Sequence, residues 1–559
     1  MSHTPNFDAK IKTILDAAQP GERVCTLTKE KWTLTKEEIA WCRSFDVPPS
    51  AIDPLVRLKM LLAHNTDLTL WYKPHALTGE PLLTFVHPDN RAKIIRDKEW
   101  ADLDNTEHGF DRDANVSFFE QMERLYEKVP FRALSDPGDS VNTIGMAAFK
   151  SSDSFMVFGS LGIERSSSVY SSLFVTDSVD VTSCFGGIGE SFGINRSRSL
   201  HDCQVVFESQ HCLHSSFLFD CRNCEFCFGA TNKRYKKYLW FNEQLSKEEW
   251  ETRRAKISLS SRDVFDTYHQ KFFELVQKSV WPETFNHVAV ESDGEYLEKT
   301  TRVRESYNLQ NSTDCFRCWA GTDLTHAAYL TGAGMSSDLW QSSGCIYSQN
   351  IKFSCGISAS QNMEYCLYCL NCEYCFGCIG LRYKKFCILN KQYTEEDYFK
   401  KLDEIKCLLL DQGMYGNPMP ADINPLGAQF SAGELLIGYS EEEIRAWGGE
   451  YFDAKRGTMY IPEPSEAQKM IQCIDPELKR PFVIPPIERA FYENHQLPLP
   501  ERHFLIRLKN LVRLSNSPLT EPASCESCLV SLSIHKNNTF EERRILCSSC
   551  YLSFLEIHG

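Results

Sequence analysis

The sequence lacks several features that would assign it to a common class of protein. It contains no apolar run of the roughly 18 residues that a membrane-spanning helix requires, so we expect no membrane segment. Basic residues do not predominate: the net charge is −15, which disfavours broad, salt-driven binding to nucleic acid. Residues 1–20 lack the apolar core of a secretory signal. We therefore predict a cytoplasmic protein.

Familiar catalytic patterns are missing as well. No Ser-His-Asp order, paired-carboxylate motif or Cys-His nucleophile signature stands out in the sequence. Gly186-Gly187-Ile188-Gly189 resembles a phosphate-binding loop only in its glycines, because no helical pattern follows it. The sequence therefore favours a non-enzymatic protein, and an enzyme is kept as an alternative.

What the sequence does contain is a ladder of small and apolar residues at every third position. The ladder extends from Ser167 to Ala230 and again from Cys315 to Cys378, and no charged residue falls on it. A spacing of three fits neither an α-helix nor the strict alternation of a β-strand. Small side chains suit a thin, closely packed interior. We predict a mainly β protein with α-helices, built around two tandem narrow β-solenoids; an irregular β-sandwich is the alternative.

Cysteine is abundant, with 24 residues, and many of them lie on the ladder. Without a secretion signal, reduced thiols are expected rather than a disulfide framework. A buried thiol packs as a small apolar group, which is our interpretation of the ladder cysteines. The run from Cys366 through Cys369, Cys372 and Cys375 to Cys378 leaves a metal or iron–sulfur site as the alternative.

Two internal repeats divide the chain. The run Cys221-x2-Cys224-x2-Cys227-Phe228-Gly229 recurs 148 residues later, and Leu55–Lys59 recurs as Leu505–Lys509, 450 residues later. We predict six segments, in this order: an N-terminal α+β module at 1–150; a first β-solenoid with a capping hairpin at 151–245; capping helices at 246–284; a second β-solenoid with its hairpin and helix at 285–410; an irregular linker at 411–470; and a C-terminal module at 471–559.

One motif carries clear metal chemistry. Cys525-x2-Cys528-x18-Cys547-x2-Cys550 has the spacing of a four-thiolate zinc ribbon. Four protein ligands leave no open coordination position, so the zinc is expected to be structural, with one ion per chain. In the N-terminal module the matching positions are His75, Thr78, Asp97 and Trp100, which cannot form this site.

The segment Cys372–Tyr393, with a weaker copy at Cys224–Leu245, resembles an uncharacterised family of cysteine-rich, zinc-ribbon-ended repeat proteins from candidate-phyla (Patescibacteria-like) bacteria. Leu77–Glu80, Trp100 and Ser117–Gln121 extend the resemblance into the N-terminal module. The resemblance implies the same architecture, with fewer metal cysteines than its relatives, and it implies no activity.

Two surface features could bind a partner. The twin basic clusters contain Lys236 and Lys237 in the first copy and Lys384 and Lys385 in the second, each next to a tyrosine, as in single-strand RNA-binding proteins. Aromatic residues also recur off the ladder, at Tyr365, Tyr368 and Tyr374. For both features the alternative is structural: a solvated hairpin tip for the lysines, and packing under a cap for the tyrosines.

The leading functional hypothesis is a zinc-binding scaffold whose solenoid faces and ribbon bind protein partners. The first alternative is an RNA-associated protein that uses the ribbon and the basic tips. The second is a β-helix protein that binds or cleaves carbohydrate along a carboxylate-lined groove.

Overall fold

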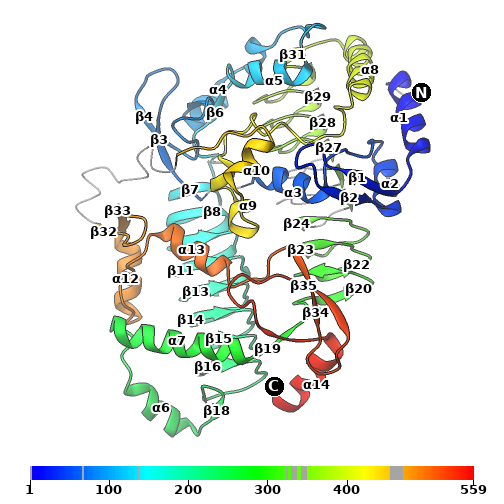
Figure 1. Cartoon of the computed structure of the whole chain (residues 1–559). Helices are drawn as coiled ribbons and strands as arrows, with labels where there is room; N and C mark the ends of the chain where they lie inside the picture. Colours follow the sequence, from blue (N-terminus) through cyan, green and yellow to red (C-terminus); the bar gives the residue numbers. More distant parts are fainter. Residues whose placement is uncertain are drawn as a thin grey trace. The chain divides into compact units, whose positions relative to one another are not determined.

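The computed structural model describes residues 3–65, 68–135, 138–322, 325–328, 337–340, 349–453, 470–479 and 481–559. The fold is mixed α/β, with helices arranged around largely parallel sheets (Figure 1). The chain divides into two units. Unit 1 joins Met1–Asp67, Trp71–Ala133 and Asn286–Gly457, and unit 2 joins Leu68–Leu70, Leu134–Phe285 and Thr458–Gly559. Each unit thus combines one end of the chain with one of the two ladder regions.

The large sheet of unit 2 is parallel apart from its last strand, and residues paired across neighbouring strands are about twelve positions apart in the sequence. Ser167 pairs with Val179, for example, and His201 with Leu213. Pairing of β12 with β14 closes the sheet on itself. Its strands are β7 (Val141–Phe149), β8 (Ser152–Glu164), β9 (Ser167–Tyr170), β10 (Leu173–Thr176), β11 (Val179–Thr182), β12 (Phe185–Gly189), β13 (Phe192–Asn195), β14 (Leu200–Phe207), β15 (Leu213–Phe219), β16 (Phe228–Thr231), β17 (Leu239–Trp240) and β18 (Glu243–Gln244). Because β7 belongs to this sheet, the sheet begins within the segment predicted as the N-terminal module.

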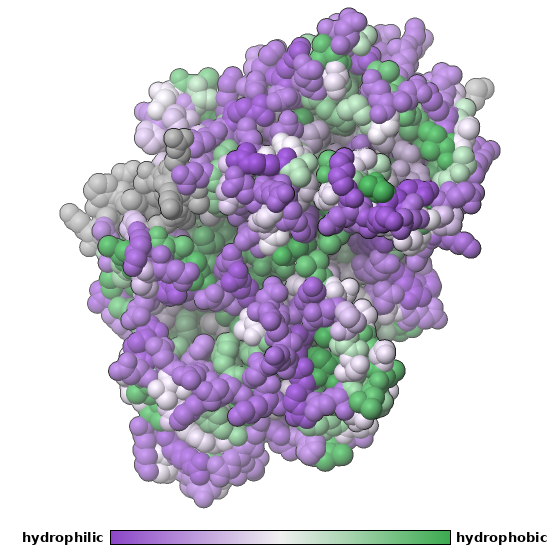
Figure 2. All heavy atoms as spheres, viewed as in Figure 1, coloured by the Kyte–Doolittle hydropathy of each residue, from purple (hydrophilic) through white to green (hydrophobic). Residues whose placement is uncertain are grey.

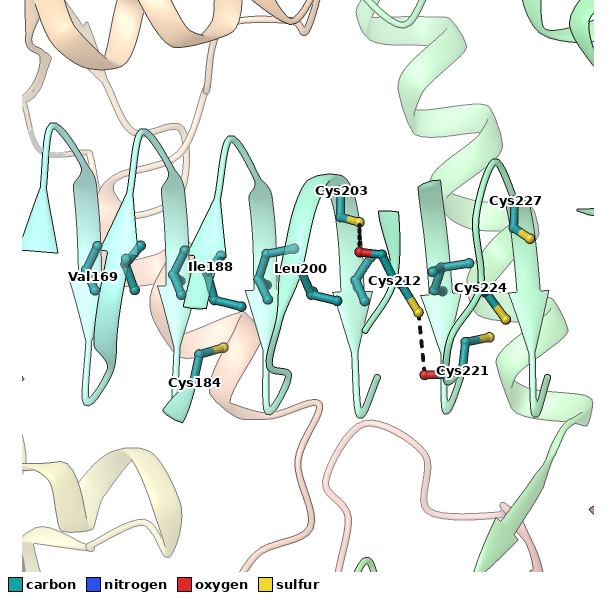
Figure 3. Packing of buried hydrophobic residues seen from close by; sticks show 14 of the residues in the cluster. Val169, Cys184, Ile188, Leu200, Cys203, Cys212, Cys221, Cys224 and Cys227 are labelled. Atoms are coloured by element: carbon teal, nitrogen blue, oxygen red, sulfur yellow. Dashed lines mark hydrogen bonds between the residues drawn. The ribbon is translucent and has the colours of Figure 1, made fainter. Parts of the chain in front are cut away.

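The interior of this sheet is lined by ladder residues from Ile188 to Ala230, as predicted, and Cys203 and Cys212 are fully buried (Figure 3). Upstream of Ile188 the predicted phase is wrong. There the interior is lined by Val169, Val175, Val181 and Cys184, one residue away from the predicted positions. The phase changes because one residue is inserted at Gly186-Gly187, where both glycines have positive φ (133° and 59°) and Val179 pairs thirteen residues ahead with Phe192.

Left-handed backbone recurs every third residue along the same sheet and turns the chain at each step. Ser168, Ser171 and Phe174 have φ values of 58°, 48° and 57°, and the pattern continues through residues of many types. Such conformations cost of order 1 kcal/mol per non-glycine residue. Backbone hydrogen bonds between successive turns, such as Ser171 N to Phe158 O at 3.0 Å, offset that cost.

The second ladder region forms the parallel strands of unit 1. They are β20 (His287–Val290), β21 (Gly294–Glu295), β22 (Glu298–Thr301), β23 (Ser306–Gln310), β24 (Trp319–Thr322), β25 (Thr325–Ala328), β26 (Ser337–Trp340), β27 (Gln349–Lys352), β28 (Gln361–Glu364), β29 (Glu373–Phe376), β30 (Lys385–Ile388) and the antiparallel β31 (Lys391–Gln392). The predicted phase is correct here: Cys315, Ile351 and Cys366–Cys378 on the ladder share one buried cluster. Cys345 lies outside the described residues.

Helices follow the end of each sheet, close to the predicted bounds. After β18 come α6 (Lys247–Ala255), α7 (Arg262–Lys278) and the short β19 (Val280–Pro282), and after β31 comes α8 (Glu395–Asp411). A capping box formed by Ser246 and Glu249 begins α6. The segment predicted as an irregular linker contains η2 (Ala428–Phe430), α9 (Ala432–Leu436) and α10 (Glu441–Ala446), so it is more ordered than predicted. Residues 454–469 of that segment lie outside the described residues.

The two ends of the chain have elements at corresponding positions. The N-terminal end contains α1 (Pro5–Ala17), β1 (Gly21–Val24), β2 (Lys31–Leu34), α2 (Lys36–Ser44), α3 (Pro54–Leu62), β3 (Trp71–Pro74), β4 (Pro81–Thr84), β5 (Lys93–Ile95), α4 (Asp97–Asp102), η1 (Asn105–His108), α5 (Phe118–Tyr126) and β6 (Pro130–Arg132). The C-terminal end contains β32 (Ile471–Ile474), β33 (Pro481–Ile484), α12 (Pro486–Asn494), α13 (Phe504–Val512), β34 (Thr520–Ser524), β35 (Ser531–His535), β36 (Arg544–Leu546) and α14 (Ser548–His558).

Each end of the chain packs on the sheet of its own unit. In unit 1, Phe118 of α5 contacts Phe376 of β29 at a ring-centroid distance of 5.1 Å. In unit 2, α13 lies over β9, β11 and β13, and β36 adds to β19 as a parallel pair. The predicted C-terminal module is therefore one structural unit with the first ladder region rather than with the second.

Candidate metal centre and surface sites

The four predicted zinc ligands come together at the C-terminal end. The Sγ atoms of Cys525, Cys528, Cys547 and Cys550 all lie within 4.8 Å of one another. The Cys528 and Cys547 sulfurs are 3.7 Å apart. A tetrahedral zinc with Zn–S bonds of about 2.3 Å needs sulfurs about 3.8 Å apart, so the thiols fit this metal. Among the described residues this is the one group of three or more such side chains close enough to hold a metal ion.

Local structure positions these thiols. Cys525 directly follows strand β34, and the turn there closes with Leu529 N donating to Cys525 O at 2.9 Å. Cys547 is the N-cap residue of α14, which brings Cys550 onto the first turn of that helix. Cys547 N donates to the Cys525 sulfur at 3.3 Å. A backbone hydrogen bond from Cys528, with others from Cys547 and Ser527, lowers the pKa of Cys525 to about 6, which favours the thiolate that a metal requires.

The metal centre is joined to the sheet of unit 2. Ser548 N donates to Glu283 Oε1 at 3.0 Å, next to the β19–β36 pair. On the following turn of α14, the hydroxyl of Tyr551 contacts Asp220 on the sheet, and Asp220 also pairs with Arg234 at 2.9 Å. Folding of the metal centre therefore fixes the position of α14 on this sheet.

The turn at Cys525 has a left-handed residue, Leu529, four positions after its first cysteine. Three other turns have the same backbone form without a full set of thiols. They begin at Cys25, His75 and Asp475, and their left-handed residues are Lys29, Gly79 and Lys479. In the second of these turns, Leu77 N and Thr78 N both donate to His75 Nδ1 at 3.2 Å, and His75 Nε2 lies 2.5 Å from Glu99 Oε2 on α4. Since Nδ1 accepts, Nε2 is the protonated nitrogen. This His75–Glu99 bond links hairpin and helix, as zinc would.

In the turn that begins at Asp475, a carboxylate occupies the position that a cysteine thiolate has at Cys525. This carboxylate accepts hydrogen bonds from the backbone of Glu477 at 2.9 Å, Leu478 at 2.8 Å and His503 at 2.8 Å. Burial opposes ionisation of Asp475, but these N–H donors outweigh it and lower its pKa to about 2. A fixed negative charge therefore satisfies the turn that a thiolate satisfies elsewhere.

The ladder cysteines that the structure describes are not grouped as metal ligands. Among the described residues no trio of them lies within metal-binding distance. Their thiols donate instead to backbone carbonyls: Cys203 Sγ to Cys212 O at 3.4 Å and Cys212 Sγ to Cys221 O at 3.6 Å (Figure 3). Burial raises the pKa of Cys203 to about 12, so this thiol remains protonated and unreactive. The packing interpretation is the one that these contacts favour.

The tyrosines predicted as a binding surface pack within unit 1. Tyr365 is fully buried, stacks on Phe353 at a centroid distance of 4.7 Å, and accepts a hydrogen bond from Gly416 N at 3.0 Å. Its assignment as a surface residue is therefore wrong. Tyr368 and Tyr374 are half-buried, the first beside Phe131 and the second stacked on Phe386.

Most of the predicted surface lysines pair with acidic residues. Lys237 pairs with Glu225, Lys385 with Glu373, and Lys384 with Asp104 at 2.7 Å. Lys236 is half-buried. These pairs cancel much of the positive charge that an RNA backbone would need.

A carboxylate-lined cleft of about 740 Å³ lies between α1 and α8. Its lining includes His3, Phe399, Glu395, Glu396, Asp403 and Glu404. Asp403 caps helix α1, because its carboxylate accepts from Phe7 N and from Asn6 Nδ2, each at 2.8 Å. The cleft lies between two helices rather than along a sheet, so it gives no support to the predicted carbohydrate-cleaving groove.

No model of a known protein family matches the chain, and no curated protein matches it at a significant level. Within the described residues, every helix is too short or too polar to cross a membrane.

Proposed function

We propose that the protein is a non-catalytic scaffold in which one zinc ion holds the C-terminal end of the chain on the first ladder region. The observation that carries this proposal is the group of four thiols within 4.8 Å of one another. Cys525, Cys528, Cys547 and Cys550 would supply all four zinc bonds, which suits a structural ion and leaves no position for substrate. When bound, zinc supplies cross-linking energy between hairpin and helix.

We also propose that the two ladder regions are narrow β-solenoids that arose by internal duplication. The twelve-residue strand spacing and the buried ladder clusters support this proposal. The matching elements at the two ends support duplication of the flanking modules, and the resemblance to the candidate-phyla family is consistent with both. Solenoids display extended side faces, which suit binding of protein partners. The many free thiols fit a reducing, cytoplasmic location.

Part of the C-terminal end is suited to contact a partner. Figure 2 shows apolar side chains gathered on this face over α14, where Leu552 and Ile557 are exposed. Leu529, which directly follows Cys528, is also exposed and has a left-handed backbone (φ 64°). Zinc binding would order the turn that presents this residue.

Metal analysis by mass spectrometry on the purified protein tests the zinc proposal. We expect one zinc per chain, and loss of most of it in the double variant Cys528→Ser, Cys547→Ser. Cys407→Ser is the matched control, since Cys407 is a half-exposed thiol outside the group. Iron, several metals per chain, or a wild-type protein without zinc would contradict the proposal.

A further inference from the structure

The two ladder regions share one stretch of high identity. Residues 221–244 and 369–392 are identical at more than half of their positions, while the preceding turns, 209–220 and 357–368, share none. Positions that remain identical after two copies have diverged this far call for a reason. Comparing the environments of the paired residues separates those that the fold needs from those that it does not.

Most of the identical residues have the same structural role in both copies. The cysteines line the two cores. Asn242 Oδ1 accepts from Thr231 N at 2.9 Å, and Asn390 Oδ1 accepts from Ile379 N at 2.8 Å. The other matched roles are the ion pairs Glu225–Lys237 and Glu373–Lys385, the hydrogen bonds of Gln244 and Gln392 to the Lys237 and Lys385 carbonyls, and the buried rings Phe228 and Phe376.

Tyr235 and Tyr383 have no hydrogen-bonding or core-packing role of this kind, although the Arg382 guanidinium lies 5.4 Å from the centroid of the Tyr383 ring. Their side chains are 78% and 69% exposed, and within the described part of the chain neither hydroxyl has a hydrogen-bond partner. Both residues are left-handed, with φ of 56° and 51°, like the other corner residues of the two sheets. Hydrogen bonding and core packing therefore give no reason to keep tyrosine at these two corners.

Each tyrosine lies beside an exposed asparagine that is also identical in the two copies. The bridges Arg222–Arg234 and Leu370–Arg382 join adjacent turns of the chain, which places Asn223 next to Tyr235 and Asn371 next to Tyr383. The nearby lysines contribute less than the sequence suggests, because Lys237, Lys384 and Lys385 are ion-paired. Both corners present an aromatic ring and an amide, and the second corner also has the Arg382 guanidinium beside its ring.

We propose that these two corners are equivalent contact sites for single-stranded nucleic acid. One base stacks on each tyrosine ring, and the neighbouring asparagine amide hydrogen-bonds to a base edge. A protein partner is less favoured, because the side chains around each tyrosine are mainly polar and an interface core is mainly apolar. Since stacking rather than charge carries the contact, this proposal is compatible with a net charge of −15. It goes beyond the scaffold function and does not depend on it.

Fluorescence anisotropy with labelled oligouridine and oligo(dT) tests the proposal on the full-length protein. Changing Tyr235→Ala or Tyr383→Ala is expected to weaken binding by about tenfold for each base that loses its stacking partner. The matched Tyr→Phe variants should bind nearly as well as wild type, because phenylalanine keeps the ring. Comparing the two oligonucleotides shows whether the 2′-hydroxyl contributes.

Two controls separate stacking from other causes. Phe174→Ala removes another aromatic side chain that is 58% exposed and left-handed (φ 57°) on the sheet of unit 2, and it should leave binding unchanged. The pair Lys237→Ala, Lys385→Ala should change affinity little, because both lysines are neutralised by glutamates. Unchanged zinc content and circular dichroism establish that each variant is folded.

The proposal is overturned if wild-type protein binds neither oligonucleotide, or if the Tyr→Ala variants bind as tightly as wild type. Loss of binding in the lysine pair but not in the tyrosine variants would also overturn it, since charge would then carry the contact. A protein cross-linked at Tyr235 or Tyr383 in place of nucleic acid would assign the corners to the other class of partner. The zinc measurement is unaffected by any of these outcomes.

Discussion

At the scale of single residues, serines and cysteines that line the interiors of the two sheets complete the backbone hydrogen bonding of the turns. Ser172 Oγ donates to Tyr170 O at 2.9 Å and accepts from Cys184 N, twelve residues ahead, at 3.2 Å. Ser354 and Ser360 of the second ladder likewise accept from Cys366 N and Cys372 N. An N–H left unpaired in these positions would cost about 1–3 kcal/mol. The small residues at these positions are therefore hydrogen-bonding partners as well as small fillers.

The two modules also contain equivalent buried ion pairs with different charge balance. In unit 1, Glu38 lies between Arg57 and Arg317, with a Glu38–Arg317 distance of 2.9 Å. In unit 2, the single Arg507 lies between Glu488, at 2.8 Å, and Asp180, at 2.9 Å. Both units therefore contain a buried Glu–Arg pair. The third member of the group is a guanidinium, Arg317, in unit 1 and a carboxylate, Asp180, in unit 2.

This difference predicts a pH dependence for unit 2. Burial, with repulsion from Glu488, raises the pKa of Asp180 to about 7 although Arg507 opposes the shift. A carboxyl group with a raised folded-state pKa stabilises the fold fully below its unfolded pKa of about 4, and this contribution is lost as the pH rises to 7. In urea unfolding, Asp180→Asn should therefore become more stable than wild type as the pH rises, by up to about 1.4 kcal/mol per pH unit, and the gain should level off above pH 7.

The groups that face Asp180 are Arg507 of α13, Glu488 and Tyr492 of α12, and Ser168 of its own sheet. Glu488 is the other carboxylate in this group, so Glu488→Gln is the control variant. A stability difference between Asp180→Asn and wild type that stays constant from pH 4 to 8 would show that Asp180 does not titrate in this range.

At the scale of elements, glycines at the corners of the second sheet allow helix α5 to approach. Gly377 has φ 63°, and a Cβ atom there would lie 2.4 Å from Phe118 Cζ. Gly413 has nearly the same conformation, φ 64°, with nothing within 4 Å of its Cβ position. An alanine at Gly413 would therefore meet backbone strain alone, and an alanine at Gly377 would meet the same strain and a steric conflict with Phe118.

Replacing each glycine with alanine tests this distinction. Gly413→Ala should cost only the strain of a left-handed alanine, about 1 kcal/mol. Gly377→Ala should cost about 1–3 kcal/mol more, because Phe118 must move out of its contact with Phe376. Thermal unfolding followed by circular dichroism measures both. Equal losses in the two variants would mean that α5 does not pack tightly against this corner.

These elements also show what the sequence could and could not predict. The grouping of the four C-terminal thiols was predictable because CxxC spacing is local and its chemistry is specific. The second ladder was predictable because its phase at Cys315 and Cys318 is the same as from Ile351 to Cys378. The first ladder was predicted out of phase before Ile188, because the one residue inserted at Gly186-Gly187 changes the register without leaving a charged residue on either phase. Tyr365 was misassigned because its burial depends on α5 and Gly416, which lie far from it in sequence.

At the scale of the whole molecule, the chain order and the structural units do not coincide. The N-terminal end and the second ladder region form unit 1, and the first ladder region and the C-terminal end form unit 2. The segments that complete unit 2 are therefore far apart in sequence, and the C-terminal segment reaches its sheet through α13, β36 and α14. A metal that stabilises the C-terminal end should thus stabilise residues of the first ladder region.

Removal of zinc is expected to act on unit 2 alone. Chelation should raise amide hydrogen exchange in residues 520–559, in β19, which pairs with β36, and at the end of β15, because Tyr551 loses its fixed position beside Asp220. Exchange in β27 to β30 of unit 1 should stay unchanged, since these strands belong to the other unit. Hydrogen exchange with mass spectrometry, before and after chelation and after zinc is restored, measures both regions at once. Equal loss of protection in the two units would show that they unfold together, and loss confined to residues 520–559 would show that the ribbon does not support its sheet.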